Sequence, residues 1–193
     1  MTPPPGYRIL KRVMDVAGTA LLLIPALPIG LAVTIAILIE DRGAPFFGQT
    51  RIGLSGRPFR IWKFRSMVPN AANLGPHHTA AGDPRITRVG RVIRKTSLDE
   101  LPQIWNVLTG EMSLVGPRPD TPVQEGDYPP DTWRRRISVL PGITGYAQVL
   151  LKTDLSGRSR TDLDLDYIAR RSLALDLWVL WATVAVVLRR QNR

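Results

Sequence analysis

The sequence predicts an α/β protein, mostly α-helical, that is held on one side of a membrane as a monotopic protein. Three observations support this fold class. Residues 13–39 are almost continuously apolar, the sixty residues that follow are basic and rich in Gly and Pro, and residues 173–188 are apolar again. We therefore expect residues 1–42 to form a basic flank and a re-entrant helix-break-helix hairpin. Residues 43–193 should form a small cytosolic domain with short strands, interfacial amphipathic helices and a C-terminal interfacial helix.

Length and composition narrow the classes of function. The chain has 193 residues, a net charge of +10 and no cysteine, so there is room for one ordinary domain and a membrane element. A strongly basic chain suits phosphates, whether in nucleic acid, lipid headgroups or substrates, and the apolar stretch favours the last two. The absence of cysteine excludes disulfides, thiolate metal sites and a cysteine nucleophile. No A-x-A-like cleavage site follows the apolar run, which favours an uncleaved membrane segment.

The first apolar segment, Val13–Ile39, would be roughly 40 Å long as a helix, enough to cross a bilayer core of about 30 Å. A single crossing is the simplest interpretation. However, Pro25 and Pro28 lie in the middle of the segment, where proline removes a backbone hydrogen bond and favours a kink or break. Both flanks are basic and so prefer the cytoplasm: Arg8, Lys11 and Arg12 before the segment, and Arg42, Arg51, Arg57 and Arg60 after it. A helix that breaks near its midpoint and returns to the same side satisfies both flanks.

The second apolar segment, residues 173–188, contains two tryptophans and Asp176 and is followed by Arg189 and Arg190. It is short for a membrane span. We expect a helix that lies in the membrane interface with its tryptophans at headgroup level. An ordinary core helix is the alternative.

A third helix is predicted in the basic middle of the chain. Arginine recurs at every third position from Arg85 to Arg94, interleaved with aliphatic residues. Such a helix has a basic side that suits an anionic surface and an apolar side, although a plain solvated face gives the same pattern. The preceding loop, residues 70–82, holds His77 and His78, which we interpret as solvated rather than as metal ligands.

Two adjacent acids, Asp99 and Glu100, follow this basic region. Ser97 and Glu100 have the spacing of a capping box, and Gly110 ends the apolar run, so we expect a short helix between them. Its core-facing residues would be Leu101, Ile104, Trp105 and Leu108. The two acids could simply complement the helix dipole. Because arginines flank them, they could also stay ionised and either bind Mg²⁺ or attack phosphorus.

Two turns rich in Pro and Gly complete the candidate site. In Gly116-Pro117-Arg118-Pro119 the prolines stiffen the turn that presents Arg118, a geometry that suits bidentate phosphate recognition or a purely structural role. Residues 141–148 (PGITGYAQ) should form a turn leading into a strand, where Tyr146 and Gln148 could receive a base or a sugar. The sequence contains no GxGxxG, P-loop, HExxH or GxSxG pattern, which excludes the commonest nucleotide-binding, protease and esterase motifs.

Several of these segments together resemble the bacterial sugar transferase family, in its small monotopic form. The resemblance extends from about residue 8 to residue 190. It is carried by Lys11, Arg12 and Asp15, by FRIWKFRSM at residues 59–67, by residues 83–119 (DPRITRVGRVIRKTSLDELPQIWNVLTGEMSLVGPRP), and by PGITGYAQV at residues 141–149.

The resemblance implies a phosphoglycosyl transferase on the cytoplasmic face of the bacterial inner membrane. In that family the acid pair, here Asp99 and Glu100, is the catalytic dyad. The aspartate is the expected Mg²⁺ ligand, and Glu100 could bind the metal as well or orient Asp99. The aspartate attacks a UDP-sugar, UMP leaves, and polyprenyl (undecaprenyl) phosphate takes the phosphosugar by ping-pong kinetics. The expected substrate-binding residues are Lys63, Arg65, Arg94, Arg118, Tyr146, Gln148 and Asp164. Membrane lipid and later glycosyltransferases are expected partners, and nucleic acid is not.

Some positions depart from the family pattern. Leu27-Pro28 stands where relatives have a Ser-Pro pair at the membrane break, and Pro25 is a possible compensation. Tyr146 replaces a tryptophan, Leu140 a basic residue, and Leu150-Leu151-Lys152 a more polar run. These departures make the donor sugar harder to infer. A non-catalytic basic protein that binds anionic lipid or nucleic acid, and an enzyme of another class on a single-crossing anchor, remain the competing interpretations.

Overall fold

The computed structural model describes residues 6–71, 74, 82–152 and 157–191. The loop histidines His77 and His78 lie outside this part of the chain. The elements, in chain order, are α1 (Tyr7–Asp41), β1 (Phe46–Ile52), η1 (Leu54–Gly56), β2 (Pro58–Phe64), α2 (Arg88–Lys95), η3 (Leu98–Glu100), α3 (Gln103–Leu108), β3 (Ser113–Val115), η4 (Pro122–Asp127), α4 (Pro130–Arg136), β4 (Gly142–Thr144), α5 (Tyr146–Lys152), α6 (Arg160–Arg170) and α7 (Leu173–Gln191). The mostly helical architecture with short strands that the sequence predicts is confirmed.

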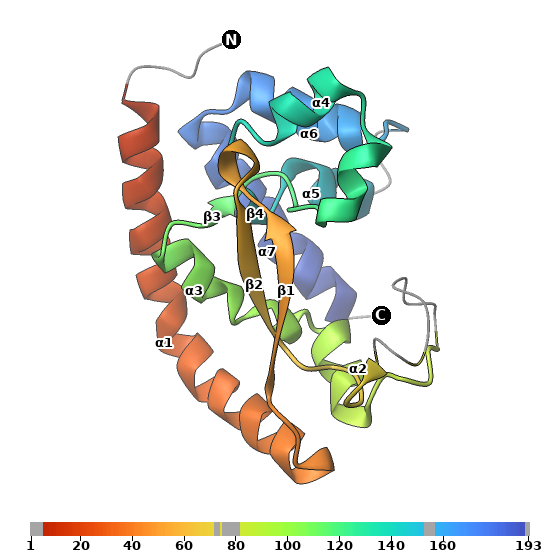
Figure 1. Ribbon diagram of the computed structural model, residues 1–193. Coiled ribbons are helices and arrows are strands. Elements are labelled where there is room, and N and C mark those ends of the chain that lie inside the picture. Colours follow the sequence, from red (N-terminus) through yellow and green to blue (C-terminus); the bar gives the residue numbers. More distant parts are fainter. Residues whose placement is uncertain (1–5, 72–73, 75–81, 153–156, 192–193) are drawn as a thin grey trace.

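Helix α1 is continuous through Pro25 and Pro28, so the predicted interruption of the helix at this point is wrong. Figure 1 shows instead that the helix axis bends on the way from the N-terminal to the C-terminal end. Each proline costs one backbone hydrogen bond, which a long helix absorbs as a bend rather than a break. Within the described residues, α1 is the one helix long and apolar enough to cross a membrane.

Both ends of α1 are attached to the rest of the protein. Near the N-terminal end, Asp15 accepts hydrogen bonds from the hydroxyl of Ser113 (3.0 Å) and from the backbone N–H of Leu114 (3.1 Å). Near the C-terminal end, Glu40 accepts from the first two backbone N–H groups of α2, and Asp41 forms an ion pair with Arg65. Much of the remaining surface of α1 is exposed and apolar, including Ile9, Leu21, Ile24, Leu27, Leu31 and Ile39.

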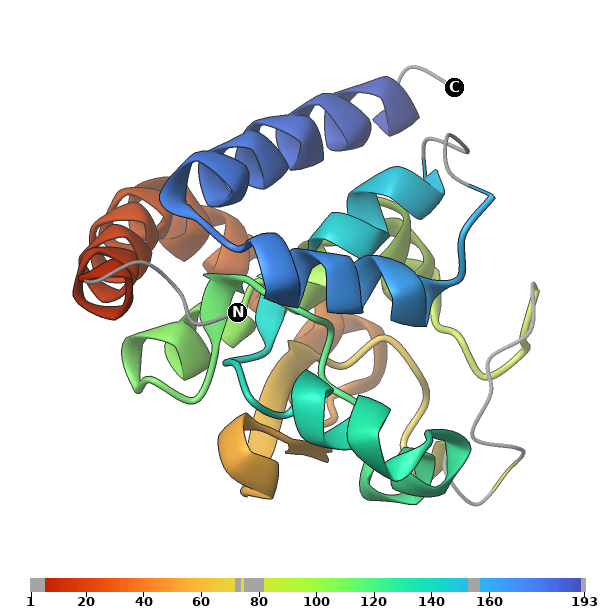
Figure 2. The ribbon, with the colours of Figure 1, turned by 90° about the horizontal axis from the view of Figure 1, so that it is seen from above.

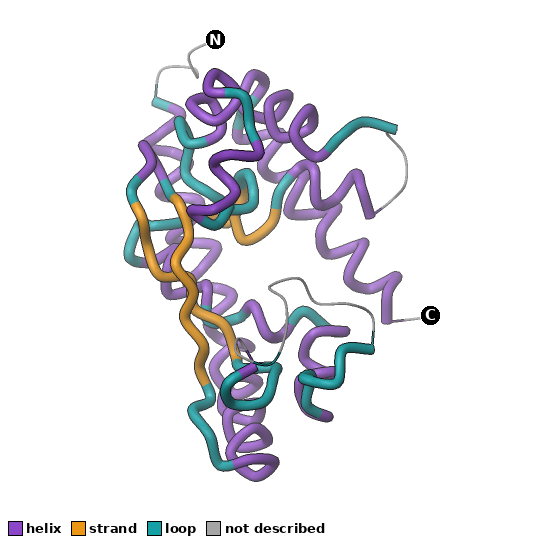
Figure 3. Tube along the Cα trace, turned by 45° about the vertical axis from the view of Figure 1, so that its right-hand side comes forward, coloured by secondary structure: helices purple, strands orange, loops and turns teal. Residues whose placement is uncertain are grey.

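The antiparallel hairpin β1–β2 extends from the helical part of the protein toward the C-terminal end of α1 (Figure 3). Its second strand is completed by a side chain. The amide of Asn106, in α3, accepts from the N–H of Trp62 (3.2 Å) and donates to the carbonyl of Arg60 (2.8 Å). The amide therefore acts as a third strand one residue long, and it fixes α3 to the hairpin.

A larger core joins the hairpin to α3, β3, α6 and α7, with Val107, Met112 and Val179 fully buried. A smaller core joins Phe64 of β2 to Val33 and Ile37 of α1 and to Ile93 of α2. Trp105, which we expected in a core, is 60% exposed. The predicted core face of α3 is therefore wrong at this position, because the Asn106 and Val107 positions pack against the hairpin instead.

The two remaining predicted helices are present. In α7, Val179 and Ala182 are buried while Trp178 and Trp181 are exposed, so the helix packs on the core and also presents an apolar outer face. Figure 2 shows that α7 begins next to α1 and then runs away from it. In α2, Ile93 is buried and Val92 is exposed, whereas Arg85 precedes the helix and pairs with Asp83.

The PGITGYAQ segment was predicted to lead into a strand, and that prediction is wrong. The strand is the turn segment itself, β4, which pairs in parallel with β3. Helix α5 begins at Tyr146. The parallel pairing requires close contact of the two backbones, since a Cβ on Gly142 would lie 2.1 Å from the nitrogen of Gly116. Two glycines therefore bring the Arg118 turn against β4.

Candidate active site

Asp99 and Glu100 lie in the short 3-10 helix η3, between α2 and α3. Ser97 has a left-handed backbone (φ 60°) and its side chain makes no capping hydrogen bond, so the predicted capping box is wrong. Glu100 is not available to a cap because its carboxylate binds two cations. Pro102 has no N–H and ends the turn, which explains why the predicted single helix is divided into η3 and α3.

Glu100 is held by cations from two other parts of the fold. Lys63 in β2 donates a hydrogen bond of 2.9 Å to Oε1 of Glu100, and Arg118 donates one of 2.6 Å to the same oxygen. Burial alone would raise the pKa of Glu100, but Arg118 and Lys63 outweigh it and lower this pKa to about 2. Glu100 is therefore ionised at neutral pH and serves to hold the two cations in place.

Asp99 has a different environment from its neighbour. No residue in the described part of the chain donates a hydrogen bond to its carboxylate, and the cations at Glu100 lie close enough to influence it. Burial raises the pKa of Asp99, while the positive charges of Lys63, Arg94 and Arg118 oppose the shift. The two acids thus divide into one that is bound by cations and one whose oxygen atoms no described residue binds.

The turn that presents Arg118 is anchored through its carbonyl groups. Pro117 and Pro119 cannot donate backbone hydrogen bonds, and four consecutive carbonyls accept them instead. The carbonyls of Pro117 and Asp120 accept from the backbone N–H groups of Gly142 and Ile52, respectively. The carbonyl of Arg118 accepts from the side chains of Arg136 and Arg160. The carbonyl of Pro119 accepts from the side chain of Arg51. The stiff presentation that the two prolines predicted is accordingly reinforced from four separate places.

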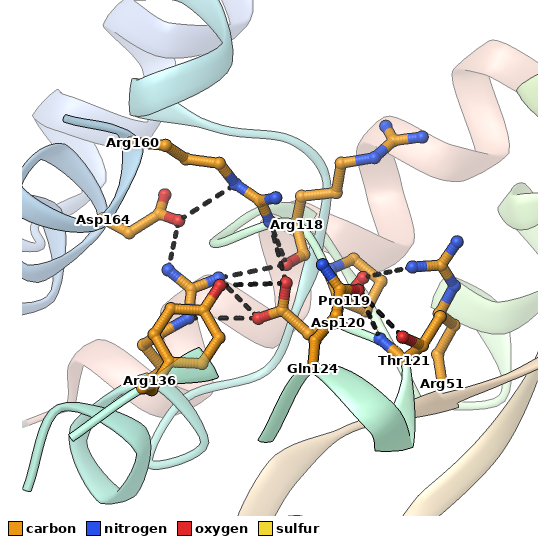
Figure 4. Close-up of polar contacts among 10 residues, drawn as sticks. Arg51, Arg118, Pro119, Asp120, Thr121, Gln124, Arg136, Arg160 and Asp164 are labelled. Carbon is orange, nitrogen blue, oxygen red and sulfur yellow. Dashed lines mark hydrogen bonds and ion pairs between the residues drawn. The ribbon is translucent and has the colours of Figure 1, made fainter. Parts of the chain in front are cut away.

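Behind the turn lies a ring of two arginines and two aspartates, which we call the Arg136 ring: Asp120, Arg136, Arg160 and Asp164 (Figure 4). Arg136 donates to Asp120 at 3.1 and 2.8 Å and to Asp164 at 2.5 Å. Arg160 lies 3.3 Å from Asp120 and 3.6 Å from Asp164. Asp120, Arg136 and Asp164 are buried and Arg160 is partly exposed. Pairing of opposite charges allows the three buried groups to stay charged.

The structure brings some of the predicted substrate-binding residues together and separates others. Lys63 and Arg118 meet at Glu100, and the charge of Arg94 acts on Asp99. Arg65, in contrast, is paired with Asp41 at the end of α1, and Asp164 is buried in the Arg136 ring. These last two residues contact protein groups rather than the acid pair.

Tyr146 and Gln148 lie in α5. The Tyr146 hydroxyl accepts a hydrogen bond of 2.9 Å from Arg170, and its ring lies against Trp178. The Gln148 Oε1 atom is buried and has no hydrogen-bond partner among the described residues. This Gln148 atom is enclosed by protein in the structure, whereas the Tyr146 hydroxyl keeps its own O–H as a donor.

Sequence reasoning missed the Arg136 ring. Arg134, Arg135 and Arg136 were not singled out, because a run of arginines normally lies in solvent. The available signal was spacing: Arg136 follows Trp133 by three residues, and side chains at this spacing lie on the same helix face. Both are buried in α4, so the tryptophan marks which of the three arginines points inward.

The described residues around the acid pair do not by themselves complete a metal site. The described residues contain no group of three or more His, Cys, Asp or Glu side chains that could hold a metal, and Oε1 of Glu100 is already bound by two cations. Asp99 offers one carboxylate. Mg²⁺ commonly binds one or two carboxylates together with substrate phosphates and water, so the donor set fits Mg²⁺ shared between Asp99 and a phosphate ligand.

A long apolar helix beside a cation-rich acid pair defines a membrane-associated protein whose site suits phosphate-bearing ligands. The chain belongs to the bacterial sugar transferase family, whose model matches residues 6–190. The resemblance drawn from the sequence motifs is thereby confirmed.

Known relatives are similar over almost the whole chain. A "UDP-galactose-lipid carrier transferase" of Erwinia amylovora is 42% identical over 96% of this chain and 42% of its own length. A "UDP-glucose:undecaprenyl-phosphate glucose-1-phosphate transferase" of Escherichia coli is 39% identical over 95% of this chain and 41% of its own length. A protein of the same description from Caulobacter vibrioides is 42% identical over 98% of this chain and 74% of its own length. The chain thus spans less than half the length of the first two relatives.

Proposed function

We propose that the protein is a membrane phosphoglycosyl transferase that moves a phosphosugar from a UDP-sugar to polyprenyl (undecaprenyl) phosphate, with release of UMP. The relatives' names support both substrate classes. The observation that carries the proposal is that the two neighbouring carboxylates have different partners. Glu100 binds Lys63 and Arg118, and Asp99 is not bound by any described residue. This arrangement supplies a nucleophile and positive charge at one place.

In the first step, an Asp99 carboxylate oxygen attacks the phosphorus that bears the sugar. A P–O bond forms to Asp99, the P–O bond to the uridylyl phosphate breaks, and UMP leaves with the electron pair. The product is a phosphosugar–aspartate ester, an acyl phosphate. Lys63 and Arg118 neutralise the negative charge of the transferring group, which is the main requirement of phosphoryl transfer.

In the second step, a phosphate oxygen of the polyprenyl phosphate attacks the same phosphorus. The bond to Asp99 breaks, the free carboxylate is restored, and the lipid leaves carrying the phosphosugar through a diphosphate. One site thereby serves a soluble donor and a membrane-bound acceptor in turn, and the expected kinetics are ping-pong. The step would begin the assembly of a polysaccharide or glycoconjugate, before later glycosyltransferases act.

Asp99 would hold Mg²⁺ jointly with the donor diphosphate, and Glu100 would not be a ligand. When bound, the ion supplies further positive charge to the transferring group. The role of Glu100 is then to keep Lys63 and Arg118 in position. Metal binding by Glu100, one of the two roles that the sequence left open for it, is not part of this proposal.

We further propose a monotopic location on the cytoplasmic face of the bacterial inner membrane. A crossing helix has its two ends on opposite sides of the bilayer. Here Asp15 near one end and Glu40 near the other are both bound by the same domain, which supports a re-entrant path with both ends on one side. The exposed tryptophans of α7, Trp178 and Trp181, suit the headgroup region beside α1.

The test uses the full chain in lipid nanodiscs with Mg²⁺, undecaprenyl phosphate and a panel of UDP-sugars. We expect UMP release and a lipid-linked phosphosugar with at least one donor. Donor labelled in the sugar, given without acceptor, should label the protein at Asp99. A chain that binds anionic lipid but never releases UMP would be a binding protein instead.

A further inference from the structure

We propose that Arg136, fixed by Asp120 and Asp164, is a positioning residue that sets where the Arg118 guanidinium stands against Glu100 during phosphosugar transfer. The inference rests on the proposed function. It also gives Asp164 a role that differs from substrate binding.

The first step of the argument is how the backbone of Arg118 is held. Its two neighbours are prolines, which have no backbone N–H, so the turn is held by hydrogen bonds to its carbonyl groups. The carbonyl of Arg118 itself accepts from Arg160 at 2.9 Å and from Arg136 at 3.4 Å. These two side chains therefore fix the backbone position of Arg118, whose guanidinium donates to Glu100 at 2.6 Å.

The second step is the geometry of Arg136. Its Nε and one terminal nitrogen bind Asp120, the same terminal nitrogen reaches the Arg118 carbonyl, and the other terminal nitrogen binds Asp164. One planar group thus joins α4, α6 and the Arg118 turn. A lysine has three donors around a single nitrogen and cannot reproduce this flat, divergent pattern.

The third step is burial. The side chain of Arg136 is 2% exposed and that of Asp164 is 3% exposed, so a substrate has no open path to the Asp164 carboxylate in this state. Asp164 instead supplies the negative charge that lets Arg136 remain buried. Asp164 consequently acts on the reaction through Arg136 and Arg118.

The test measures UMP release by Arg136→Lys. We expect kcat to fall about 100-fold, because a displacement of roughly 1 Å at a reacting group has an effect of this size. The KM for the donor should change less than about three-fold, because the lost interaction stabilises the transition state rather than the bound donor. Arg134→Lys is the matched control, since it lies in the same helix with its side chain 73% exposed, and it should keep wild-type kinetics. Asp164→Asn should resemble Arg136→Lys, and Asp131→Asn should resemble the wild type.

A double-mutant cycle separates positioning from a merely structural role. In an Arg118→Gln background, measured by single-turnover labelling at high enzyme concentration, Arg136→Lys should cost less than about three-fold further, because the two residues act as one unit. The inference would be overturned if Arg136→Lys lowered the rate by the same factor in the Arg118→Gln background as in the wild type. It would also be overturned if the thermal midpoint of Arg136→Lys fell so far that unfolding explained the lost activity. If Arg136→Lys does not fold, Arg160→Lys tests the same carbonyl from a side chain that is 35% exposed. A wild-type chain that releases no UMP would overturn the inference and the proposed function together.

Discussion

Arg118 donates to the same oxygen atom of Glu100 that Lys63 also binds, at 2.6 and 2.9 Å respectively. One carboxylate oxygen thus gathers two cations from a turn and a strand that are far apart in the sequence. The neighbouring Asp99 lies within the influence of these charges without being bound by them. The two acids are therefore chemically distinct, and their substitution should have distinct effects.

Asp99→Asn should remove the nucleophile without disturbing the packing. We expect turnover to fall by about 10⁴-fold or more, the range seen when a residue that forms or activates a covalent intermediate is replaced. Labelling of the protein by sugar-labelled donor should disappear, while the thermal midpoint and membrane partitioning stay the same. Near-normal activity would refute the nucleophile assignment.

Glu100→Gln should behave differently because it leaves Lys63 and Arg118 without their shared anion. Partly buried charges that lose a partner cost about 1–3 kcal/mol, so we expect lower stability and slower labelling, with the label still on Asp99. Denaturant unfolding in detergent and a labelling time course would measure the two effects. Complete loss of labelling in a stable Glu100→Gln variant would instead make Glu100 a participant in the chemistry.

The pH dependence of the reaction should report Asp99. Its pKa is raised by burial, and only the ionised carboxylate attacks, so activity should fall as the pH drops through this raised value, above the usual range near 3.9. Lys63→Met removes a positive charge that lowers the pKa of Asp99, and the acid limb should move to higher pH. The measurement is kcat/KM for the donor between pH 4 and 8. An acid limb that moves to lower pH in this variant would contradict the assignment.

Asn106→Ala should destabilise the hairpin. It leaves the N–H of Trp62 and the carbonyl of Arg60 without their partner, and unsatisfied buried groups cost about 1–3 kcal/mol each. The two groups together cost about 2–6 kcal/mol, so the thermal midpoint should fall by roughly 4–24 °C for a chain of this length. Val123→Ala, at a side chain that is 88% exposed, is the control and should melt like the wild type.

The prolines of α1 can be tested by chemical labelling because the chain has no cysteine of its own. Arg8→Cys and Ala44→Cys place one exposed thiol on each side of the apolar segment. Both should react with a membrane-impermeant reagent only from the cytoplasmic side. Adding Pro25→Ala and Pro28→Ala straightens the helix and should move some molecules toward a full crossing. Unchanged sidedness would mean that the contacts at the two helix ends, and not the prolines, determine the path.

The sequence predicted the features that depend on local pattern. The apolar length of α1, the acid pair and the stiff Arg118 turn follow from composition and from glycine and proline positions. The helix break was wrong because proline spacing cannot distinguish a bend from an interruption, which depends on how both halves of α1 pack. The orientation of Trp105 was wrong because apolar periodicity does not reveal that a polar residue, Asn106, completes the sheet.

The Arg136 ring was beyond prediction for a related reason. Its members come from separate turns and helices, and each one alone is an ordinary charged residue. Only the fold brings Asp120 of the Arg118 turn between α4 and α6. Long-range pairing of buried charges has no short sequence signature, so the support of an active site is harder to predict than the active site itself.

The attachment of α1 at both ends has a consequence for the lipid environment. A helix that spans a membrane must match the thickness of the hydrocarbon layer and tilts or deforms the lipids when it does not. In the proposed monotopic arrangement, a helix whose termini are bound to one domain would meet a single leaflet, at a depth set by the protein. The activity of the protein should then depend little on the acyl chain length of the host lipids. The acyl region of one leaflet, rather than the whole bilayer, would be the medium that the apolar surface of α1 contacts.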